Sequence, residues 1–455
     1  MQSLNIGSRR ELFIDRYLIE RLDRAELRLQ RPLPREVVFQ VKSPAENACT
    51  ACYNLTQEDD RILMYYRGYY PLGESGGDAA ESQTAHLAVS ADGVRFERPS
   101  LGLVDFAGSS DNNIVLRGRA AHNLVVFRDA NPAVDPSQLY KAVGNSGTDN
   151  LHGFVSADGL HWRPIKEGPL DIPGAFDSVN VPLWDPHTGQ YRLFSRYFEA
   201  VNGRVRAIQS CASDDFIHWT RPVPHRYSEG APLEQFYTNA TAVVPGAEHI
   251  LVSFPMRFVP QRTRDTEGMD YPGNGISDAV FLSSRDGEYW DRTFMEAWMR
   301  PGLDRRNWTH RNCTTAPGII ATAPDEWSLY MIEHYGWNDN RLRRLTVRPH
   351  GFASVSAGWQ GGELLTLPLC FAGDRLRLNY STSAVGYVRL ELQDTDGRPL
   401  PGFGLEDMEP LFGDELDEVV TWQSGADLGA LAGRPVRLRV ELQDADLFSL
   451  RFAAE

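Results

Sequence analysis

Ser156-Ala-Asp-Gly-Leu-His-Trp162 is one of four copies of a phrase that recurs along this chain. The other copies are Ser90-Ala-Asp-Gly-Val-Arg-Phe96, Ser213-Asp-Asp-Phe-Ile-His-Trp219 and Ser284-Arg-Asp-Gly-Glu-Tyr-Trp290. Each copy follows a short apolar run, and the first three are closely followed by Arg-Pro. The pattern predicts a strand, a tight turn around the Asp, and a second strand that begins with an aromatic residue.

The spacing of the copies predicts repeated blades. Their first residues lie 66, 57 and 71 residues apart, and a weaker echo, Arg348-Pro-His-Gly-Phe-Ala-Ser354, begins 64 residues after Ser284. Repeats of four short strands at this period are typical of a β-propeller, so we predict five blades. The tryptophans that end the phrase are predicted to be buried between blades: Trp162, Trp219 and Trp290. Three aspartates are predicted to shape the turns: Asp92, Asp158 and Asp286.

The sequence pattern changes after Gly351. Segments such as Arg375-Leu-Arg-Leu-Asn-Tyr380 and Val436-Arg-Leu-Arg-Val-Glu-Leu442 alternate apolar and polar residues. Strands with one buried and one exposed face have this alternation. We therefore predict an all-β chain in which a five-bladed β-propeller (residues 41–355) is followed by a β-sandwich (356–455). Residues 1–40 are predicted to be a lead-in, either a packed strap or a strand that completes the last blade.

Composition limits the function. The 455 residues carry a net charge of −15, and Lys and Arg form no basic cluster, which argues against a nucleic-acid partner. The 39 Gly and 28 Pro suit a protein rich in turns. No segment is apolar over a membrane-spanning length, and the first residues lack the apolar core of a signal peptide. We therefore expect no membrane partner and a cytoplasmic location.

Cysteine and histidine spacing argues against metal and redox chemistry. Five scattered cysteines do not suggest a disulfide framework, and Cys49-Thr-Ala-Cys52 has no second pair. The histidines show no ligand spacing, and no phosphate-binding glycine loop occurs. We therefore expect neither a metal nor another cofactor.

Three acidic residues stand where inner strands are predicted to begin: Glu46 in blade 1, Asp177 in blade 3 and Glu234 in blade 4. Glycoside cleavage uses one protonated carboxyl to protonate the leaving oxygen and an ionised one as nucleophile or base. A third carboxylate can bind sugar hydroxyls and separate the pKa values of the other two. The alternative is that these residues are only solvated or turn residues at strand starts.

The predicted architecture and several motifs resemble glycoside hydrolase family 32 and its relatives in family 43, and especially a family-32-like bacterial group. The motifs include Met64-Tyr-Tyr-Arg-Gly68, Phe176-Asp-Ser-Val-Asn180, Glu234-Gln-Phe-Tyr-Thr-Asn239 and Arg300-Pro-Gly302. The resemblance implies a glycosidase that acts on furanosides such as fructo- or arabinofuranosides. In it Glu46 would be nucleophile or base, Asp177 would orient and stabilise, and Glu234 would be the acid, with Glu46 and Glu234 facing each other across the tunnel mouth.

The chain departs from family 32 in several motifs. It lacks the Asn-Asp-Pro-Asn, Arg-Asp-Pro and Glu-Cys motifs, and Glu46 replaces the usual Asp of blade 1. Retention and inversion of stereochemistry both remain open.

Further residues are predicted to bind an oligosaccharide or small glycoside: Asp111, Asn112, His122, Asn180, Arg196, Tyr237, Asn239, Arg257 and Arg311. Trp308 and Tyr70 are candidates for stacking on a sugar face. Two other functions compete with hydrolysis: a propeller that binds carbohydrate without catalysis, and a glycoside phosphorylase. Arg196, Arg257 and Arg311 could supply the anion site that phosphorolysis needs. Convergence of the three carboxyls on one cavity would favour the enzyme.

Overall fold

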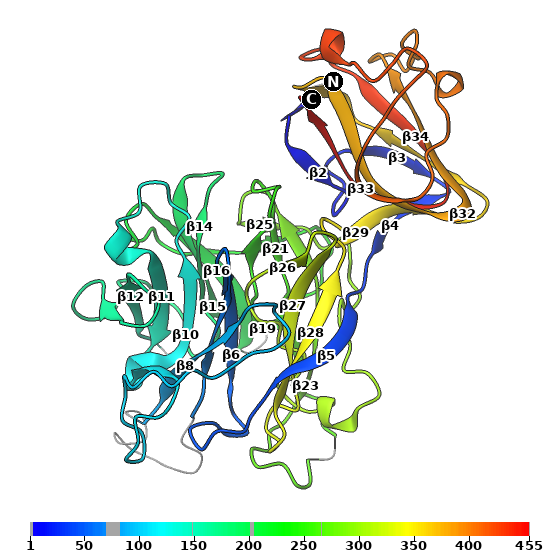
Figure 1. Ribbon diagram of the computed structural model, residues 1–455. Coiled ribbons are helices and arrows are strands. Elements are labelled where there is room, and N and C mark those ends of the chain that lie inside the picture. The colour runs from blue at the N-terminus through cyan, green and yellow to red at the C-terminus, as the bar shows by residue number, and fades with distance from the viewer. Residues whose placement is uncertain (1–2, 70–81, 148, 201–203, 265, 455) are drawn as a thin grey trace. The chain divides into compact units, whose positions relative to one another are not determined.

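The computed structural model describes residues 3–69, 82–147, 149–200, 204–264 and 266–454. The chain divides into two compact units (Figure 1), Pro32–Thr346 and a second unit that combines Met1–Arg31 with Val347–Glu455. We call them the propeller and the terminal β domain. The described residues contain no α-helix. They contain five short 3-10 helices: η1 (Arg119–Ala121), η2 (Pro136–Gln138), η3 (Arg305–Asn307), η4 (Leu405–Asp407) and η5 (Gly429–Leu431).

Three regular blades of the propeller are four-stranded antiparallel sheets whose strands follow chain order. Blade 1 contains β6 (Ala51–Gln57), β7 (Ile62–Arg67), β8 (Thr84–Ser90) and β9 (Ile114–Arg117). Blade 2 contains β10 (His122–Arg128), β11 (Tyr140–Asn145), β12 (Leu151–Ser156) and β13 (Arg163–Pro164). Blade 3 contains β14 (Val181–Asp185), β15 (Gln190–Glu199), β16 (Val205–Ser213) and β17 (Val223–Pro224).

Blade 4 is interrupted, because each of its three main strands is broken into two segments. One half pairs β19 (Gln235–Thr238), β22 (Met256–Val259) and β23 (Ile276–Ala279). The other half pairs β20 (Ala242–Val243), β21 (Leu251–Ser253) and β24 (Leu282–Ser284). At its edge, β18 (Arg226–Tyr227) pairs in parallel with β25 (Tyr289–Trp290).

Blade 5 is completed by a strand from near the N-terminus. Its sheet has the order β26 (Ile320–Ala323), β27 (Glu326–Glu333), β28 (Arg341–Val347) and β5 (Leu33–Gln40). Figure 1 shows β5 alongside β28, and the two strands pair antiparallel. The predicted five-bladed propeller is therefore confirmed, and residues 33–40 close its ring rather than form a separate strap.

The repeated phrase forms the same turn four times. In each copy the Ser Oγ accepts the backbone N–H three residues on, at 2.8–2.9 Å. The Asp Oδ1 accepts two further backbone N–H groups at 2.7–2.9 Å. These aspartates therefore shape turns, as predicted. In the third copy Phe216 replaces the glycine and has a φ of 65°, close to the 73–77° of the glycines. Its buried ring packs against Phe127, Tyr191 and Trp219 and so offsets the backbone strain.

The tryptophans of the phrase differ in burial, which corrects one prediction. Trp290 is fully buried and stacks on His225, with ring centroids 5.1 Å apart. Trp162 and Trp219 are only half-buried. Trp290 packs against both Phe194 and His225, whereas Trp162 packs against Tyr65 and Trp219 against Phe216.

Buried asparagines join neighbouring inner strands. Asn54 of β6 donates to Leu124 O of β10 at 2.9 Å and accepts from Val126 N at 2.8 Å. Asn340 of blade 5 donates to Ala48 O and Thr50 O of blade 1 at 2.9 and 2.8 Å. These side-chain amides form hydrogen bonds with backbone N–H and C=O groups that have no partner in a neighbouring strand.

The terminal β domain combines both ends of the chain. Four N-terminal strands pair with C-terminal ones: β1 (Leu4–Gly7) with β31 (Leu369–Phe371), β2 (Arg10–Leu12) with β34 (Arg437–Ala453), β3 (Ile19–Asp23) with β30 (Gly362–Thr366), and β4 (Ala25–Leu29) with β29 (Ala353–Ala357). The long strand β32 (Arg375–Gln393) pairs with β33 (Asp414–Val419) and β34. Alternate residues of β32 and β34, such as Leu390 and Leu438, enter one apolar core.

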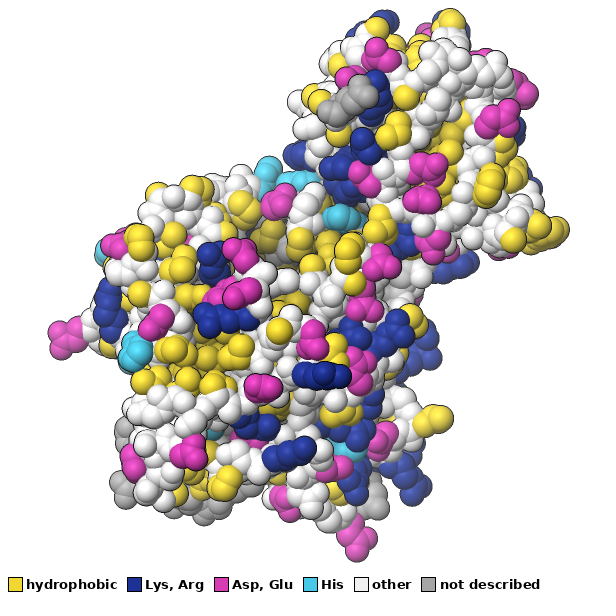
Figure 2. All heavy atoms as spheres, viewed as in Figure 1, with side chains coloured by type: hydrophobic (Ala, Val, Ile, Leu, Met, Phe, Trp, Pro, Cys, Tyr) yellow, Lys and Arg dark blue, Asp and Glu magenta, His cyan; other side chains and the backbone are white. Residues whose placement is uncertain are grey.

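The face shown in Figure 2 carries intermixed acidic and basic side chains. Within the described residues, no helix combines the length and apolar character required to cross a membrane.

Candidate active site

A cavity of about 170 Å³ lies where the five blades meet, and residues of every blade line it. We call it the central cavity. Its lining is Ala51, Cys52, Arg67, His122, Asn123, Asp177, Ser178, Val179, Tyr237, Thr238, Met256, Tyr271, Arg311, Thr314, Ile332 and Tyr335. The first residues of β6 and β10 line this cavity, blade 3 contributes residues just before β14, and blades 4 and 5 contribute residues of strands and connections.

Asp177 is the one carboxylate among the described residues that line the central cavity. Its side chain is 56% exposed, and one oxygen accepts a hydrogen bond from His122 Nε2 at 3.1 Å. This hydrogen bond is the main cause that lowers the pKa of Asp177, against burial and with help from the charges of Arg196 and Arg67. Burial lowers the pKa of His122 despite its contact with Asp177. The pair is therefore an ionised carboxylate beside a neutral imidazole, whose Nδ1 faces the Gln83 side chain.

Three arginines surround this carboxylate. Arg67 is buried and donates to Asn123 Oδ1 and Cys49 O, both at 2.7 Å. Arg311 donates to Tyr335 Oη at 2.9 Å. Arg196, buried behind the lining, donates to Ala175 O at 3.1 Å. The central cavity is therefore basic, whereas the whole chain is acidic.

Backbone strain concentrates at this cavity. Cys52, Asn123 and Arg311 line it with φ values of 56°, 51° and 60°, in the left-handed region that non-glycine residues avoid. The strand pairing is irregular between Ala51 and Asn54 in blade 1 and between His122 and Val125 in blade 2. Bulges of this kind redirect side chains, and strain of this kind gathers at functional sites.

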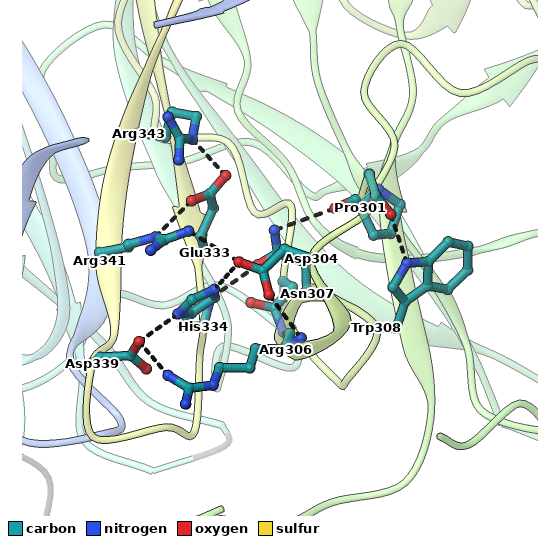
Figure 3. A network of polar contacts seen from close by, with 12 residues as sticks. Pro301, Asp304, Arg306, Asn307, Trp308, Glu333, His334, Asp339, Arg341 and Arg343 are labelled. Atoms are coloured by element: carbon teal, nitrogen blue, oxygen red, sulfur yellow. Dashed lines mark hydrogen bonds and ion pairs between the residues drawn. The ribbon is translucent and has the colours of Figure 1, made fainter. Parts of the chain in front are cut away.

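A charged network joins the segment around η3, which precedes Arg311 in the chain, to Glu333, His334 and Asp339 (Figure 3). The buried ring of His334 lies between Asp304 Oδ2 at 2.8 Å and Asp339 Oδ2 at 2.9 Å. The backbone N–H of His334 donates to Asn307 Oδ1 at 3.2 Å. Glu333 accepts from Arg341 and Arg343 at 2.7 and 2.6 Å. Tyr335 directly follows His334, just after β27 ends at Glu333, and is the partner of Arg311, so the network fixes both side chains.

Glu46 lies outside the central cavity, contrary to the sequence prediction. Its side chain has no exposed surface and accepts from Arg98 at 2.7 and 3.0 Å and from Tyr66 Oη at 2.7 Å. The backbone N–H groups of Lys42 and Ser43 donate to it at 3.0 and 3.1 Å. Burial would raise the pKa of Glu46, but Arg98 and these hydrogen bonds lower it overall. Both oxygens of Glu46 already accept these hydrogen bonds and have no lone pair left for a substrate. We therefore assign Glu46 a structural role.

Glu234 lines a different cavity of about 630 Å³, which we call the blade-4 cavity. Arg257 donates to Glu234 at 2.8 Å, and Arg292 forms a second, close ion pair. Arg257 also bonds Asp278 at 2.9 and 2.7 Å. These surroundings are the opposite of the apolar or like-charged site that a general acid requires. The expected convergence of Glu46, Asp177 and Glu234 is therefore not what the structure shows.

The predicted substrate-binding residues divide into three groups. His122, Tyr237 and Arg311 line the central cavity with Asp177, and Arg196 supports it. Asn180 and Asn239 are buried and donate to backbone carbonyls, Asn239 at 3.3 Å to Val179 O and 3.2 Å to Phe194 O. The rest lie elsewhere: Asp111 and Asn112 in an outer loop, where Asn112 bonds Val104 O, and Arg257 and Trp308 in the blade-4 cavity. Tyr70 lies outside the described residues.

Sequence reasoning missed several lining residues. Arg67 lies near the end of a second strand, as Arg196 and Arg257 do, so its position in the sequence does not distinguish it from them. In the structure Arg67 lines the central cavity, whereas Arg257 faces the blade-4 cavity. Tyr271 and Tyr335 had no sequence signal, because they come from connections rather than inner strands.

The part of the chain that is described contains no cluster of metal ligands and no disulfide. No group of three or more His, Cys, Asp or Glu is placed there to hold a metal ion. All five cysteines are free thiols. Cys52 Sγ donates to Asn123 Oδ1 at 2.9 Å, and burial raises its pKa.

The fold and the site define a five-bladed β-propeller with a basic, tyrosine-lined central cavity. No protein-family model matches the chain, and no curated protein matches it. An N-acetylgalactosamine deacetylase from F. plautii, solved with blood group B trisaccharide, is 13% identical, covers 71% of this chain and 95% of its own, and has a TM-score of 0.45. A family 43 arabinoxylan arabinofuranohydrolase from Bacillus subtilis is 11% identical, with coverages of 91% and 97% and a TM-score of 0.42.

A third similar structure concerns family 130 of mannoside phosphorylases, which contains glycoside hydrolases that target β-1,2 mannosidic linkages in Candida mannan. It is 13% identical, covers 74% of this chain and 96% of its own, and has a TM-score of 0.40. Glycoside hydrolases and related enzymes thus recur among the similar structures. At TM-scores below 0.5 the function of this chain rests on its own site.

Proposed function

We propose that this chain cleaves or transfers a glycosidic bond in the central cavity, with Asp177 as the reacting carboxylate. The observation that carries the proposal is the Asp177–His122 pair, an ionised and accessible carboxylate in a cavity built by all five blades. Such a carboxylate can activate water, attack the anomeric carbon, or stabilise an oxocarbenium-like transition state. The resemblance to families 32 and 43 makes fructo- and arabinofuranosides the first substrates to test.

Protonation of the leaving group needs a second acidic group. Paired-carboxylate hydrolysis requires a second carboxyl about 5 to 9.5 Å from the first. Within the described residues Asp177 has no such partner in the cavity lining, because Glu46 and Glu234 are held elsewhere by arginines. Aryl glycosides with activated leaving groups need no proton donor, so turnover is expected on them before it is expected on natural linkages.

The test is turnover of a panel of 4-nitrophenyl furanosides and pyranosides by the full chain and by Asp177→Asn. We expect the substitution to lower kcat by about 10²- to 10⁴-fold, the usual worth of an acid–base group, with an unchanged Tm. Asp60→Asn is the matched control, because Asp60 is exposed in the β6–β7 turn, at the end of β6 opposite to the cavity. Equal turnover by Asp177→Asn and wild type would refute the assignment.

A saccharide-binding propeller without catalysis is the second candidate. Among the described lining residues Asp177 is the one carboxylate, and this favours binding because one carboxylate can orient sugar hydroxyls without breaking a bond. Saccharide binding that depends on Asp177, together with no turnover of any panel member, would select this function over the first.

A further inference from the structure

We infer that the central cavity binds an oxyanion, held by Arg311 with Arg196 behind it. The inference rests on the proposed function for its substrate class. The anion would be the carboxylate of an acidic saccharide, or inorganic phosphate that accepts the glycosyl group.

The charge balance of the cavity is the first argument. Within the described residues, the guanidinium of Arg311 lines the central cavity without a carboxylate partner and that of Arg196 lies behind it, whereas Asp177 is the one lining carboxylate. Among the described residues, Glu46 is paired with Arg98 and Glu234 with Arg257 and Arg292, so neither carboxylate is free to offset these charges. Buried charges are normally paired, so a surplus of positive charge in a cavity is a site for an anion.

The surroundings of Arg311 are the second argument. Its guanidinium lies 5.5, 5.7 and 5.4 Å from the ring centroids of Tyr237, Tyr271 and Tyr335. Among the described residues it has no carboxylate partner, and its one side-chain hydrogen bond goes to Tyr335 Oη at 2.9 Å. A guanidinium has five N–H donors, so most of them remain for a ligand. Its planar fork suits the two oxygens of a carboxylate or phosphate.

The rigidity of this arginine is the third argument. Its backbone is held at a φ of 60°, and the network around His334 secures the segment before it. A cation fixed in place before the ligand arrives loses little conformational freedom on binding. The chain as a whole has a net charge of −15, so general attraction cannot concentrate anions here and a local site is required.

The test measures binding without turnover, by titration calorimetry of the full chain with glucuronate, glucose and inorganic phosphate at low ionic strength. We expect at least one anion to bind about tenfold or more tightly than glucose, as a charge-assisted hydrogen bond predicts. Tighter binding of glucuronate alone would indicate an acidic saccharide, and tighter binding of phosphate would indicate phosphorolysis. If neither anion binds more tightly than glucose, the inference is wrong.

Three variants sharpen the result. Arg311→Gln should lose at least about tenfold in anion affinity, while Arg300→Gln, an exposed arginine of the blade-4 cavity, should lose none. If Arg311→Gln fails to fold, the anion affinity of Asp177→Asn provides an independent test. This substitution removes the one carboxylate among the described lining residues, so it should tighten anion binding while it lowers turnover. Turnover of neutral aryl glycosides with no anion preference would refute the anion site and leave the proposed function standing.

Discussion

Glu46 and Asp177 both stand just before an inner strand of the propeller, yet their surroundings differ completely. The side chain of Glu46 has no exposed surface, whereas that of Asp177 is 56% exposed. Arg98, Tyr66 and two backbone N–H groups saturate Glu46. Asp177 has His122 as its hydrogen-bond donor and faces the cavity. The start of an inner strand therefore does not decide whether a carboxylate is accessible; the donors around it do.

The partner of Glu46 explains its role. Arg98 also donates to Gln40 O at 2.7 Å and lies 3.8 Å from the ring centroid of Phe39. Gln40 and Phe39 belong to β5, the strand that completes blade 5. Arg98 follows the repeated turn of blade 1, so the Glu46–Arg98 pair joins the first blade to the last. We infer that Glu46 stabilises ring closure.

The largest expected effect is that of Glu46→Gln on stability. Loss of one partner leaves Arg98 without its counter-charge, which in a buried pair costs about 3 to 5 kcal/mol of unfolding free energy. Urea denaturation of the full chain measures this loss, with Glu229→Gln at an exposed position as the control. Turnover per folded molecule should stay unchanged. Normal stability combined with lost turnover would show that Glu46 takes part in catalysis and that its structural assignment is wrong.

The same pair has a pH signature. The pKa of Glu46 is lower in the folded chain than its ordinary value near 4.3, so its contribution to stability is present above that pH. The contribution is lost as the pH falls through the lowered pKa. The difference in stability between wild type and Glu46→Gln should therefore shrink on acidification.

The second effect separates the tryptophans of the repeated phrase. Trp290 is fully buried between His225 and Phe194, so Trp290→Ala should cost about 3 kcal/mol as a large-to-small core change. Trp219 is half-buried, so Trp219→Ala should cost less than about half as much. Calorimetric melting of both variants measures the order. A larger loss for Trp219 would show that its contacts with Phe216 hold the strained turn.

The fold was predictable because its signal is local. Within each phrase the Ser and Asp bond to backbone groups two or three residues on, so residue types alone reveal the turn. The alternation in Ala25–Leu29 also predicts a strand, but its partner β29 lies more than 300 residues later. The sequence left open whether residues 1–40 form a packed strap or complete the last blade, and this strand belongs to the terminal β domain.

The site was only partly predictable because its decisive contacts are long-range. Asp177 meets His122 across 55 residues, and both were predicted as site residues. Arg98 binds Glu46 across 52 residues of sequence, and Arg292 binds Glu234 across 58. The sequence around either glutamate does not identify its arginine partner. An acidic residue at a strand start looks the same in sequence whether it is saturated or open.

The smallest expected effect concerns the pH dependence of Asp177. The hydrogen bond from His122 is the main cause that lowers the pKa of Asp177, whereas an arginine does the same for Glu46. Asp177 acts in its ionised form, so turnover falls as the pH drops through that pKa, below the usual range of an aspartate. His122→Phe removes the donor, so the pKa of Asp177 should rise and the acid limb of kcat/KM should move to higher pH.

At neutral pH the cost of His122→Phe should stay below about tenfold, because Asp177 remains ionised there and one hydrogen bond is worth about 1 kcal/mol. The pH profile of kcat/KM on an activated aryl glycoside measures the shift. His152→Phe is the matched control, since His152 is a half-buried histidine of β12 that bonds Ser146 at 2.7 Å and does not line the cavity. An acid limb that stays in place in His122→Phe would show that Arg196 and Arg67 hold the charge of Asp177 without the histidine. Asp177 would then resemble Glu46 more closely than their contacts suggest.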